Sequence, residues 1–501
     1  MPQQTAEPLP APGRNYIAGR WTDGSSDAVL ASINPATGEV LGVVPDSSPA
    51  DIDRAVAAAA EAWPGWRATP APRRAEILYR VAERLVSRKE ALARLMTREM
   101  GKILDETRGD VQEAIDMTYF IAGEGRRLHG YTAPSEMPRK AAYCVRAPLG
   151  VVGVITPWNF PMAIPSWKII PALVCGNTVV FKPAPETPLV AAAFVALLEE
   201  AGLPPGVLNL VHGGDATGAA LVDHPGVALI SFTGSTEVGL QVAARCAARG
   251  VRVSLEMGGK NAAIVLDDAD LDLATDALTW SAFGTTGQRC TACSRILVTP
   301  GVHPQVVDRL AGRGKTVRVG DGLDPATEMG PLVSALQLDR VERYIAIGRT
   351  EGARVVLGGE RLTLRGLEKG FFYAPTIFDG VRPQMRVAQE EIFGPVVGVI
   401  DCSSLDEAIG IVNGVRYGLS ASIFTRDVSK AMRAIEEINT GIVYVNHGTT
   451  GAEVHFPFGG TRQTGNGHRE GGLQVLDVFT EWKSVYIDYS GRLQRAQIDR
   501  D

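Results

Sequence analysis

Cys290 has the side chain best suited to covalent chemistry in this chain. It lies in a loop rich in glycine and threonine, FGTTGQRCTAC. Arg289 beside it, together with backbone amides, would lower the pKa of the thiol, and a thiolate is a strong nucleophile. The alternative is an inert thiol packed in the core, which is the usual state of a buried cysteine.

Two further polar residues stand at the ends of segments that are typical of buried strands. Glu256 follows VRVSL and precedes a methionine and two glycines. A carboxylate at that place is costly unless it is paired or catalytic. Asn159 follows another such segment, in TPWNFP, where an asparagine can also serve a purely structural turn. Taken singly, each residue is ambiguous.

The segment FTGSTEVG, residues 232–239, indicates a site for an anion. It follows an apolar segment and opens a helix, so Gly234 permits close approach. Ser235 offers a hydroxyl and an N–H at the positive end of the helix dipole. This combination fits a pyrophosphate, and a capped helix without a ligand fits it as well. The G-x-G-x-x-G fingerprint is absent, and Arg309 replaces the first glycine that a P-loop ending in Gly314 would need.

The six cysteines predict neither a metal site nor a disulfide framework. Cys290 and Cys293 form a C-x-x-C pair, but neither a second pair nor a histidine at ligand spacing accompanies them. We therefore expect no metal. Irregular cysteine spacing in a chain of this size indicates a reducing cytoplasm.

The composition excludes several classes of function. The 501 residues include 50 Lys and Arg against 56 Asp and Glu, a net charge of −6, and no dense basic block favours nucleic-acid binding. Residues 169–181 are the most apolar stretch, but Pro171, Gly176 and Asn177 interrupt it, so we expect no membrane span. The first 15 residues are rich in proline and glutamine and predict a disordered tail, not a signal peptide.

The elements that position these residues alternate between two kinds. Residues 50–126 predict helices, with Asp51 as the cap of the first. From Ala142 onward, β-branched segments alternate with helical ones, and CVRAPLGVVGVITPW predicts one strand buried on both faces. Strands that alternate with helices predict a parallel sheet with right-handed crossovers, so the class is α/β with a Rossmann-like domain.

A second alternating series begins after Gly258 and predicts a second α/β domain. Its strands are expected at NAAIVL, SRILVTP, EIFGPVVGVI, SASIFT and GIVYVN. The last segment, FTEWKSVYIDYS, alternates apolar and polar residues like a strand but has no local partner. We expect it to add to the sheet of another subunit.

Seven motifs occur in the order that is typical of the NAD(P)-dependent aldehyde dehydrogenase superfamily. They are TPWNFP, FKPAPETP, FTGSTEVG, LEMGGKN, GQRCT, EEIFGP and PFGG. The chain resembles this superfamily from residue 17 to residue 486. Seven ordered motifs are far more specific than any one of them, so the resemblance favours the catalytic interpretation of Cys290, Glu256 and Asn159.

The resemblance implies oxidation of an aldehyde to a carboxylic acid. Cys290 would attack the aldehyde carbon, and the Asn159 amide with the Cys290 N–H would hold the oxyanion. Glu256 would activate the water that hydrolyses the thioester, and members that pass the acyl group to coenzyme A lack this glutamate. Lys168 resembles a lysine of a proton relay, although a surface lysine would have the same sequence signature.

The resemblance also implies NAD as cofactor. Lys182 would bind the adenosine ribose, Ser235 the pyrophosphate, and Glu391 and Phe393 the nicotinamide ribose and ring. Many relatives that prefer NAD carry a glutamate where this chain has Pro185, so NADP stays possible; NAD is favoured because no arginine stands nearby. The other implied cofactor contacts are Ile155, Thr156, Pro157, Trp158, Gly214, Gly218, Phe232, Gly234 and Val238.

The loop NHGTTGAEVHFPFGG resembles the anchor loop of semialdehyde dehydrogenases, and GAE and GQRCT resemble the α-aminoadipate semialdehyde enzymes. A small aldehyde with a carboxylate is therefore the expected substrate, held by backbone amides of residues 448–452. The implied substrate contacts are Arg289, Thr291, Gly451, Ala452 and Phe458. The alternatives are a tunnel for simple aliphatic or aromatic aldehydes, a non-redox thiol esterase and a non-enzymatic binding protein.

The family fold implies three parts. Residues 1–127 and 148–257 would form the NAD(P)-binding domain and residues 258–477 the catalytic domain. Residues 128–147 and 478–501 would form a small β oligomerisation element with a C-terminal tail. This element is too small for a core of its own, so we expect a homodimer or homotetramer.

Overall fold

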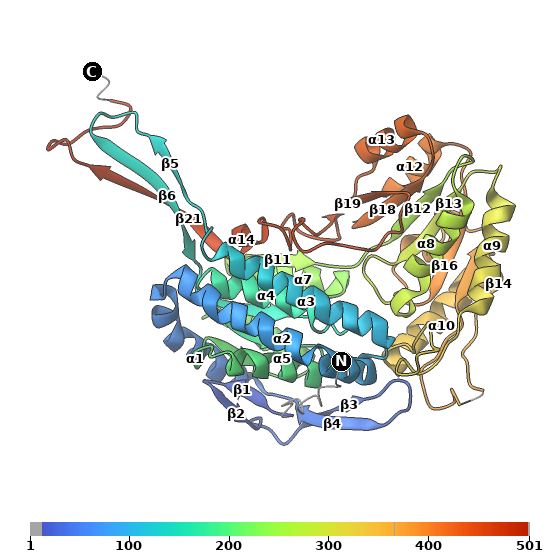
Figure 1. The fold of residues 1–501 in the computed structure, drawn as a ribbon, viewed down its shortest axis with the longest axis horizontal. Coiled ribbons are helices and arrows are strands. Elements are labelled where there is room, and N and C mark those ends of the chain that lie inside the picture. The colour runs from blue at the N-terminus through green and yellow to red at the C-terminus, as the bar shows by residue number, and fades with distance from the viewer. Residues whose placement is uncertain (1–12, 365, 499–501) are drawn as a thin grey trace.

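The computed structural model describes residues 13–364 and 366–498. Two seven-stranded sheets, each covered by helices, form the body, and a three-stranded arm projects from it (Figure 1). The tail expected over residues 1–15 lies almost entirely outside the described residues. Within the described ranges, no helix is both long and apolar enough to cross a membrane.

The first sheet is doubly wound and has the strand order β11-β10-β7-β8-β9-β1-β2. The strands from β11 to β9 are parallel, and the antiparallel β1 and β2 close one edge. The order reverses between β7 and β10, and ligands of such sheets bind at the carboxyl ends beside the reversal. The strands are β1 (Asn15–Ile17), β2 (Arg20–Thr22), β7 (Val151–Ile155), β8 (Thr178–Lys182), β9 (Leu208–Leu210), β10 (Leu229–Thr233) and β11 (Arg252–Glu256).

Helices cover both faces of the first sheet and bury two apolar clusters against it. On one face, α5 begins at Pro188, a residue suited to the first helical turn, and is apolar nearly all round because it is buried between neighbours. The helices of that face are α2 (Ala71–Met100), α3 (Leu104–Glu124), α4 (Ala163–Val174) and α5 (Pro188–Glu200). Those of the other face are α1 (Pro49–Ala68), α6 (Asp215–Asp223) and α7 (Thr236–Ala248).

The second sheet has the order β14-β15-β16-β13-β12-β18-β19, and all its strands except β14 are parallel. The α/β class expected from the alternating segments is thus confirmed in both sheets. The strands are β12 (Asn261–Val265), β13 (Cys293–Val298), β14 (Arg354–Leu357), β15 (Thr376–Asp379), β16 (Val396–Asp401), β18 (Ser420–Phe424) and β19 (Ile442–Val445).

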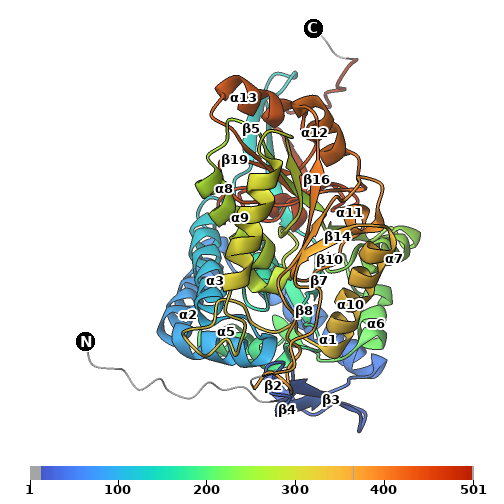
Figure 2. The same cartoon turned by 90° about the vertical axis from the view of Figure 1, so that its right-hand side faces the viewer.

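Two helical layers also enclose the second sheet (Figure 2). One layer holds α8 (Leu271–Phe283) and α9 (His303–Thr316). The other holds α10 (Ala335–Thr350), α11 (Arg386–Gln389), α12 (Leu405–Asn413) and α13 (Val428–Glu437). The remaining short elements are β3 (Val29–Ile33), β4 (Val40–Pro45), the 3₁₀ turn η1 (Gly284–Gly287), β17 (Tyr417–Gly418), β20 (Thr461–Arg462) and α14 (Val475–Val478).

The arm differs from the sequence-based prediction at two points: its C-terminal strand has a partner within the chain, and one predicted strand is divided in two. It consists of β5 (Tyr131–Pro134), β6 (Lys140–Pro148) and β21 (Thr480–Asp488), with β6 in the middle. The C-terminal strand β21 therefore pairs with β6 of its own chain, antiparallel over its whole length. Likewise, the segment predicted as one buried strand is two strands, because Gly150 (φ +136°) turns the chain and Asn177 Oδ1 accepts the N–H of Leu149 and of Gly150.

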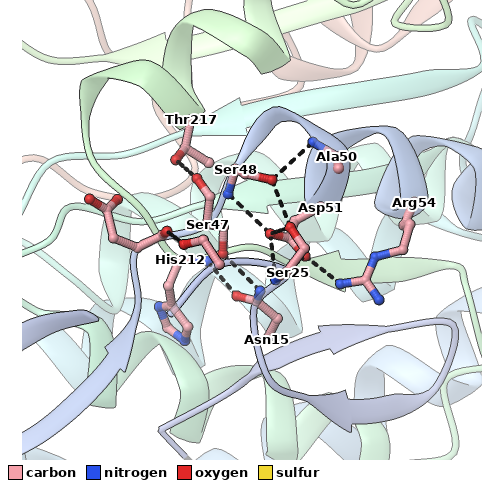
Figure 3. Close-up of polar contacts among 11 residues, drawn as sticks. Asn15, Ser25, Ser47, Ser48, Ala50, Asp51, Arg54, His212 and Thr217 are labelled. Carbon is pink, nitrogen blue, oxygen red and sulfur yellow. Dashed lines mark hydrogen bonds and ion pairs between the residues drawn. The ribbon is translucent and has the colours of Figure 1, made fainter. Parts of the chain in front are cut away.

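A buried polar network ties the start of α1 to the first sheet (Figure 3). Ser48, not Asp51, is the N-cap of α1; Asp51 completes the capping box by accepting the Ser48 N–H at 3.0 Å. Asn15 of β1 donates to Ser47 at 2.8 Å and accepts the His212 N–H at 2.9 Å. These bonds fix the carboxyl end of β9 and the following turn, where the chain approaches Lys182.

Candidate active site

The carboxyl edge of the first sheet faces the amino edge of the second. Residues 257–260 connect the end of β11, at Glu256, directly to the start of β12. Cys290 precedes β13, and Phe393 precedes β16. Asn159 follows β7 and Ser235 follows β10, so the strand reversal of the first sheet lies opposite the nucleophile loop.

A cavity of about 170 Å³ lies where the two edges meet. It shares three lining residues, Ser235, Arg340 and Glu391, with an open groove of about 750 Å³ that leads outward. The predicted site residues that line the cavity together are Pro157, Trp158, Asn159, Gly234, Ser235, Cys290, Glu391 and Phe393. One space is therefore bounded by the expected nucleophile and by the expected nicotinamide contacts.

The thiol of Cys290 is in an environment that disfavours the thiolate. Burial, and then the carboxylates of Glu391 and Glu256, raise the pKa of Cys290 to about 12. Arg289 does not offset this, since its guanidinium donates to Glu106 at 3.0 Å and to Thr285 at 2.7 Å. The expectation that Arg289 lowers the pKa of the thiol is therefore wrong.

The loop before Cys290 has a strained backbone. Thr285 (φ +52°) and Thr286 (φ +57°) adopt the left-handed conformation, which costs a non-glycine residue roughly 1–2 kcal/mol each. Gly287 (φ +67°) follows, and a Cβ there would lie 2.0 Å from the Gly394 carbonyl oxygen. Only glycine fits at position 287. The three left-handed residues together set the direction in which the backbone approaches Cys290.

Two side-chain amides hold the backbone around Cys290. Asn159 Nδ2 donates to the Gln288 carbonyl at 3.1 Å, which places the amide beside the loop and leaves its second hydrogen for another acceptor. Asn261 Nδ2 donates to the carbonyl oxygens of Cys290 and Ala292 at 2.7 and 2.9 Å. This arrangement suits an oxyanion formed next to Cys290.

Glu256 is buried, and neither of its carboxyl oxygens has a hydrogen-bond partner among the described residues. Burial and the nearby Glu470 raise the pKa of Glu256 well above its ordinary value, while Lys168 and Arg469 oppose the rise. A buried carboxyl group of this kind fits a proton acceptor with a raised pKa.

Lys168 is fully buried, so the alternative of a surface lysine is wrong. Its ammonium group donates to Glu470 and, at 3.2 Å, to Ser231. Glu470 is held in place because its N–H and carbonyl pair with those of Phe458. Glu256, Lys168 and Glu470 thus interact electrostatically behind the site.

The residues expected to hold a pyrophosphate lie at the start of α7. Ser235 is its N-cap and accepts the Val238 N–H at 3.3 Å, and the chain approaches closely at Gly234, where a Cβ would meet the Phe232 ring at 2.5 Å. Six other expected cofactor contacts, among them Lys182 for the adenosine ribose, do not line the cavity. Ile155, Thr156, Lys182 and Pro185 lie at or just after the ends of β7 and β8, and Gly214 and Gly218 lie at the start of α6 and within it.

The loop that carries Glu391 and Phe393 is held by one face of α10. Gln337 Nε2 donates to the Phe393 carbonyl at 2.6 Å, and Arg340 Nη2 donates to the Glu391 carbonyl at 2.5 Å. Phe393 (φ +63°) meets the Trp158 ring edge-on at 5.4 Å, and Glu391 accepts the Gly259 N–H at 2.9 Å.

Comparison with known proteins agrees with this geometry. The model of the aldehyde dehydrogenase family matches residues 21–485. The chain belongs to the aldehyde dehydrogenase family. The α-ketoglutaric semialdehyde dehydrogenase of Bacillus subtilis is 44% identical over 475 residues, which is 94% of this chain and 97% of that protein.

Two further relatives of this aldehyde dehydrogenase are informative. The malonate-semialdehyde dehydrogenase 1 of Geobacillus thermodenitrificans is 40% identical and covers 94% of this chain and 98% of its own. The crystal structure of betaine aldehyde dehydrogenase from Staphylococcus aureus in complex with NAD+ is 35% identical, with a TM-score of 0.94 over 96% of each chain. The family and the fold that the seven motifs indicate are therefore confirmed.

The residues expected to contact substrate are more scattered in this aldehyde dehydrogenase, and none of them lines the 170 Å³ cavity. Arg289 is paired with Glu106, and the Thr291 carbonyl accepts from Thr449 at 2.7 Å. Phe458 packs edge-on against Trp167 at 5.6 Å. Gly451 and Ala452 lie in an exposed part of their loop.

The sequence did not predict five residues whose hydrogen bonds hold the candidate site. They are Glu106, Asn261, Gln337, Arg340 and Glu470. Of these five, only Asn261 lies inside one of the seven motifs, as the last residue of LEMGGKN, so its position in that motif was a signal for a role in the site. The other four reach the site from helices or loops distant in the chain and carry no local signal.

Proposed function

We propose that this aldehyde dehydrogenase oxidises a carboxylate-bearing semialdehyde to the acid with NAD+ and releases the product by hydrolysis. The observation that carries the proposal is the shared cavity. Cys290 and Asn159 line it together with Ser235, Glu391 and Phe393. An aldehyde carbon attached to Cys290 would therefore lie in the same cavity as the place proposed for the nicotinamide.

The residues present fit a dinucleotide. The α7 N-terminus with Ser235 suits a pyrophosphate, and the adjoining groove suits an elongated molecule. When bound, NAD+ supplies a hydride acceptor. The protein would contribute Phe393 against the ring and Glu391 toward the ribose.

The chemistry assigned to the chain begins with the Cys290 thiolate, which adds to the aldehyde carbon and forms a thiohemiacetal. The Asn159 amide and the Cys290 N–H would stabilise its oxyanion, and loss of one such donor typically costs ~3 kcal/mol of transition-state stabilisation. Expulsion of hydride from that carbon leaves a thioester on Cys290.

Hydrolysis of the thioester is proposed to depend on Glu256. Its carboxyl group has no hydrogen-bond partner among the described residues, so it is available to take a proton from water. Lys168 and Glu470, which bind each other and act in opposite directions on the pKa of Glu256, would adjust how readily Glu256 takes up and releases that proton. We therefore favour the non-acylating reaction over transfer to coenzyme A.

The surroundings of Lys182 favour NAD over NADP. Burial lowers the pKa of Lys182 to about 8, and the carboxylates of Glu186, Asp215 and Asp46 act on it in the opposite direction. Three carboxylates near the proposed ribose site would repel a 2′-phosphate, even though Pro185 replaces the usual glutamate.

The substrate class rests on the relatives and on the charge beside the nucleophile. The names of two relatives specify α-ketoglutaric and malonate semialdehydes, which both carry a carboxylate. Arg289 keeps one nitrogen, Nη1, that makes no hydrogen bond within the described residues, and Gly451, Ala452, Thr291 and Phe458 stay candidate contacts. Arg289 would attract the distal carboxylate.

The domain boundaries given above are kept as a proposal, with the arm as the oligomerisation element of a cytoplasmic homodimer or homotetramer. Both outer strands of the arm, β5 and β21, have one edge without a partner strand among the described residues. The free edge of a sheet can pair with another copy of the chain. Size-exclusion chromatography with light scattering tests this assignment.

Absorbance at 340 nm tests the function. The purified protein would be mixed with NAD+ or NADP+ and with α-ketoglutarate, malonate and succinate semialdehydes, acetaldehyde or benzaldehyde. We expect NADH formation that Cys290→Ser abolishes, and a kcat/KM about 100-fold higher for carboxylate-bearing aldehydes, near 2.7 kcal/mol. Equal rates on plain aldehydes would contradict the substrate class, and acceleration by coenzyme A would contradict hydrolysis.

A further inference from the structure

The strained loop before Cys290 is held by a carboxylate from another part of the molecule. Glu106 lies in the first turn of α3, about 180 residues earlier in the chain, and its side chain is almost fully buried. Its Oε1 accepts the Thr285 N–H at 2.6 Å and Arg289 Nη2 at 3.0 Å. The same oxygen thus binds both ends of the segment that precedes the nucleophile.

Arg289 closes the arrangement into a ring. Its Nε donates to Thr285 Oγ1 at 2.7 Å, so Glu106, Thr285 and Arg289 are bonded in all three pairs. Trp280 lies 4.9 Å from the guanidinium on one side. The chain between Thr285 and Arg289 is therefore fixed at two points while its backbone stays left-handed.

The position of the carboxylate explains why a strained turn persists. A β-branched residue leaves the left-handed region unless its surroundings prevent it, and such strain collects at functional sites. Thr285 N–H would point into a buried region without an acceptor if Glu106 were absent, and Arg289 would be a buried charge without its partner. A neutral acceptor such as glutamine could accept the Thr285 N–H, but it would not balance the charge of Arg289.

We infer that Glu106 is a positioning residue for Cys290: it holds the loop in its strained conformation through Thr285 and Arg289, and so sets where the thiol lies relative to the substrate carbon. The inference rests on the function proposed above, because it concerns the same reaction. Glu106 contacts neither the thiol nor any cavity-lining residue directly in the described hydrogen bonds, so its effect passes through the loop.

The test compares Glu106→Gln with the wild-type enzyme on two substrates, a semialdehyde and propanal. A displaced nucleophile slows attack on any aldehyde, and a misplacement of about 1 Å can cost ~100-fold in rate. We expect kcat to fall about 30- to 100-fold with both substrates, whereas any effect on the proposed contact between Arg289 and the carboxylate would change KM for the semialdehyde alone. The dissociation constant of NAD+ should stay within about twofold, since the α7 cradle does not involve this loop.

The chain offers a matched control and a rescue. Glu124→Gln removes a second buried carboxylate of α3, which pairs with Arg127 at 2.6 Å far from the loop, and should leave kcat within about twofold. Thr285→Gly in the Glu106→Gln background should recover about tenfold in kcat, because glycine adopts positive φ without strain.

Several outcomes would overturn the inference. These are an unchanged kcat in Glu106→Gln, a loss of kcat confined to the semialdehyde, or a double variant whose losses simply add. If the glutamine variant does not bind NAD+ and is not folded, Glu106→Asp, which keeps the charge on a shorter chain, is judged by the same criteria. A wild-type enzyme that forms no NADH would instead contradict the proposed function.

Discussion

The two sheets contribute opposite edges to one site. The first sheet supplies its carboxyl edge, with Trp158 after β7, Ser235 after β10 and Glu256 at the end of β11. The second supplies its amino edge, with Cys290 before β13 and Phe393 before β16. The general rule that ligands bind at carboxyl ends therefore describes only the first sheet.

The two edges also differ in what holds them. Ser235 caps its own helix, so the proposed cofactor cradle is built by neighbours in the chain. The Cys290 loop is left-handed at Thr285 and Thr286 and depends on side chains from elsewhere, such as Glu106. Substitutions in the two regions should therefore change different kinetic constants. Those in the proposed cofactor cradle should change KM for NAD+, and those that disturb the Cys290 loop should change kcat.

The largest effect is expected at the point where the edges join. Glu256→Gln should lower steady-state kcat about 10³-fold, because a general base contributes 10²–10⁴-fold and glutamine cannot accept the proton. The KM for NAD+ should change less than about threefold, since Glu256 does not line the cradle. Steady-state assays at 340 nm check this. A loss of NAD+ binding in Glu256→Gln would contradict the assignment of kcat and KM for NAD+ to different edges.

Two glycines sharpen the comparison. Gly287→Ala places a Cβ 2.0 Å from a backbone oxygen at positive φ, so the nucleophile loop must move and kcat should fall about 100-fold. Gly234→Ala meets the Phe232 side chain instead, which should raise KM for NAD+ about tenfold with kcat kept. Kinetics of both variants test this, and a kcat loss in Gly234→Ala equal to that in Gly287→Ala would remove the distinction.

The pH dependence should differ in sign between the two edges. The pKa of Cys290 is raised to about 12 and that of Glu256 is also raised, and both must lose a proton to act. Because the ionised fraction grows tenfold per unit below the pKa, kcat/KM for the aldehyde should rise by up to about tenfold per unit between pH 7 and 9.

On the cofactor edge the pKa of Lys182 is lowered to about 8, so its charge is lost over the same interval and KM for NAD+ should rise. Initial rates at saturating NAD+ and at saturating aldehyde separate the two trends. A flat aldehyde profile would show that neither buried group limits the reaction.

The smallest effect is expected at the cradle hydroxyl. Ser235→Ala removes one hydrogen-bonding group from the proposed cofactor site, worth about 1 kcal/mol, so KM for NAD+ should rise about fivefold with kcat unchanged; the lost helix cap costs stability and not affinity. Ser404→Ala is the matched control, since Ser404 caps α12 in the same way at 3.2 Å but lies away from the cavity. Equal changes of KM in both variants would argue against a cofactor role for Ser235.

The sequence predicted the elements at the carboxyl edge of the first sheet better than the contacts of the Cys290 loop, for a physical reason. Apolar strands followed by a glycine, a serine and a helix are local patterns, and they located Gly234 and Ser235 on the strand reversal. The partners of the loop are not local: Glu106 reaches Thr285, and Arg340 reaches Glu391, across stretches that no periodicity connects.

The errors of prediction have the same origin. Arg289 is adjacent to Cys290 in sequence, so it was expected to activate the thiol, but tertiary contacts direct its charge to Glu106. The run from Cys144 to Trp158 is rich in β-branched residues and predicts one strand. Asn177 accepts the N–H groups of Leu149 and Gly150, and the run is divided between the arm and the first sheet. In both cases a distant side chain decided the outcome.

The central claim, oxidation of an aldehyde while it is bound to Cys290, is tested most directly by mass spectrometry of the peptide that carries Cys290. The Glu256→Gln enzyme would be mixed with NAD+ and a semialdehyde and quenched with acid. We predict an acyl adduct on Cys290 that is two hydrogens lighter than the simple addition product of thiol and aldehyde. An unmodified Cys290 peptide, or an adduct of the same mass with and without NAD+, would contradict the account.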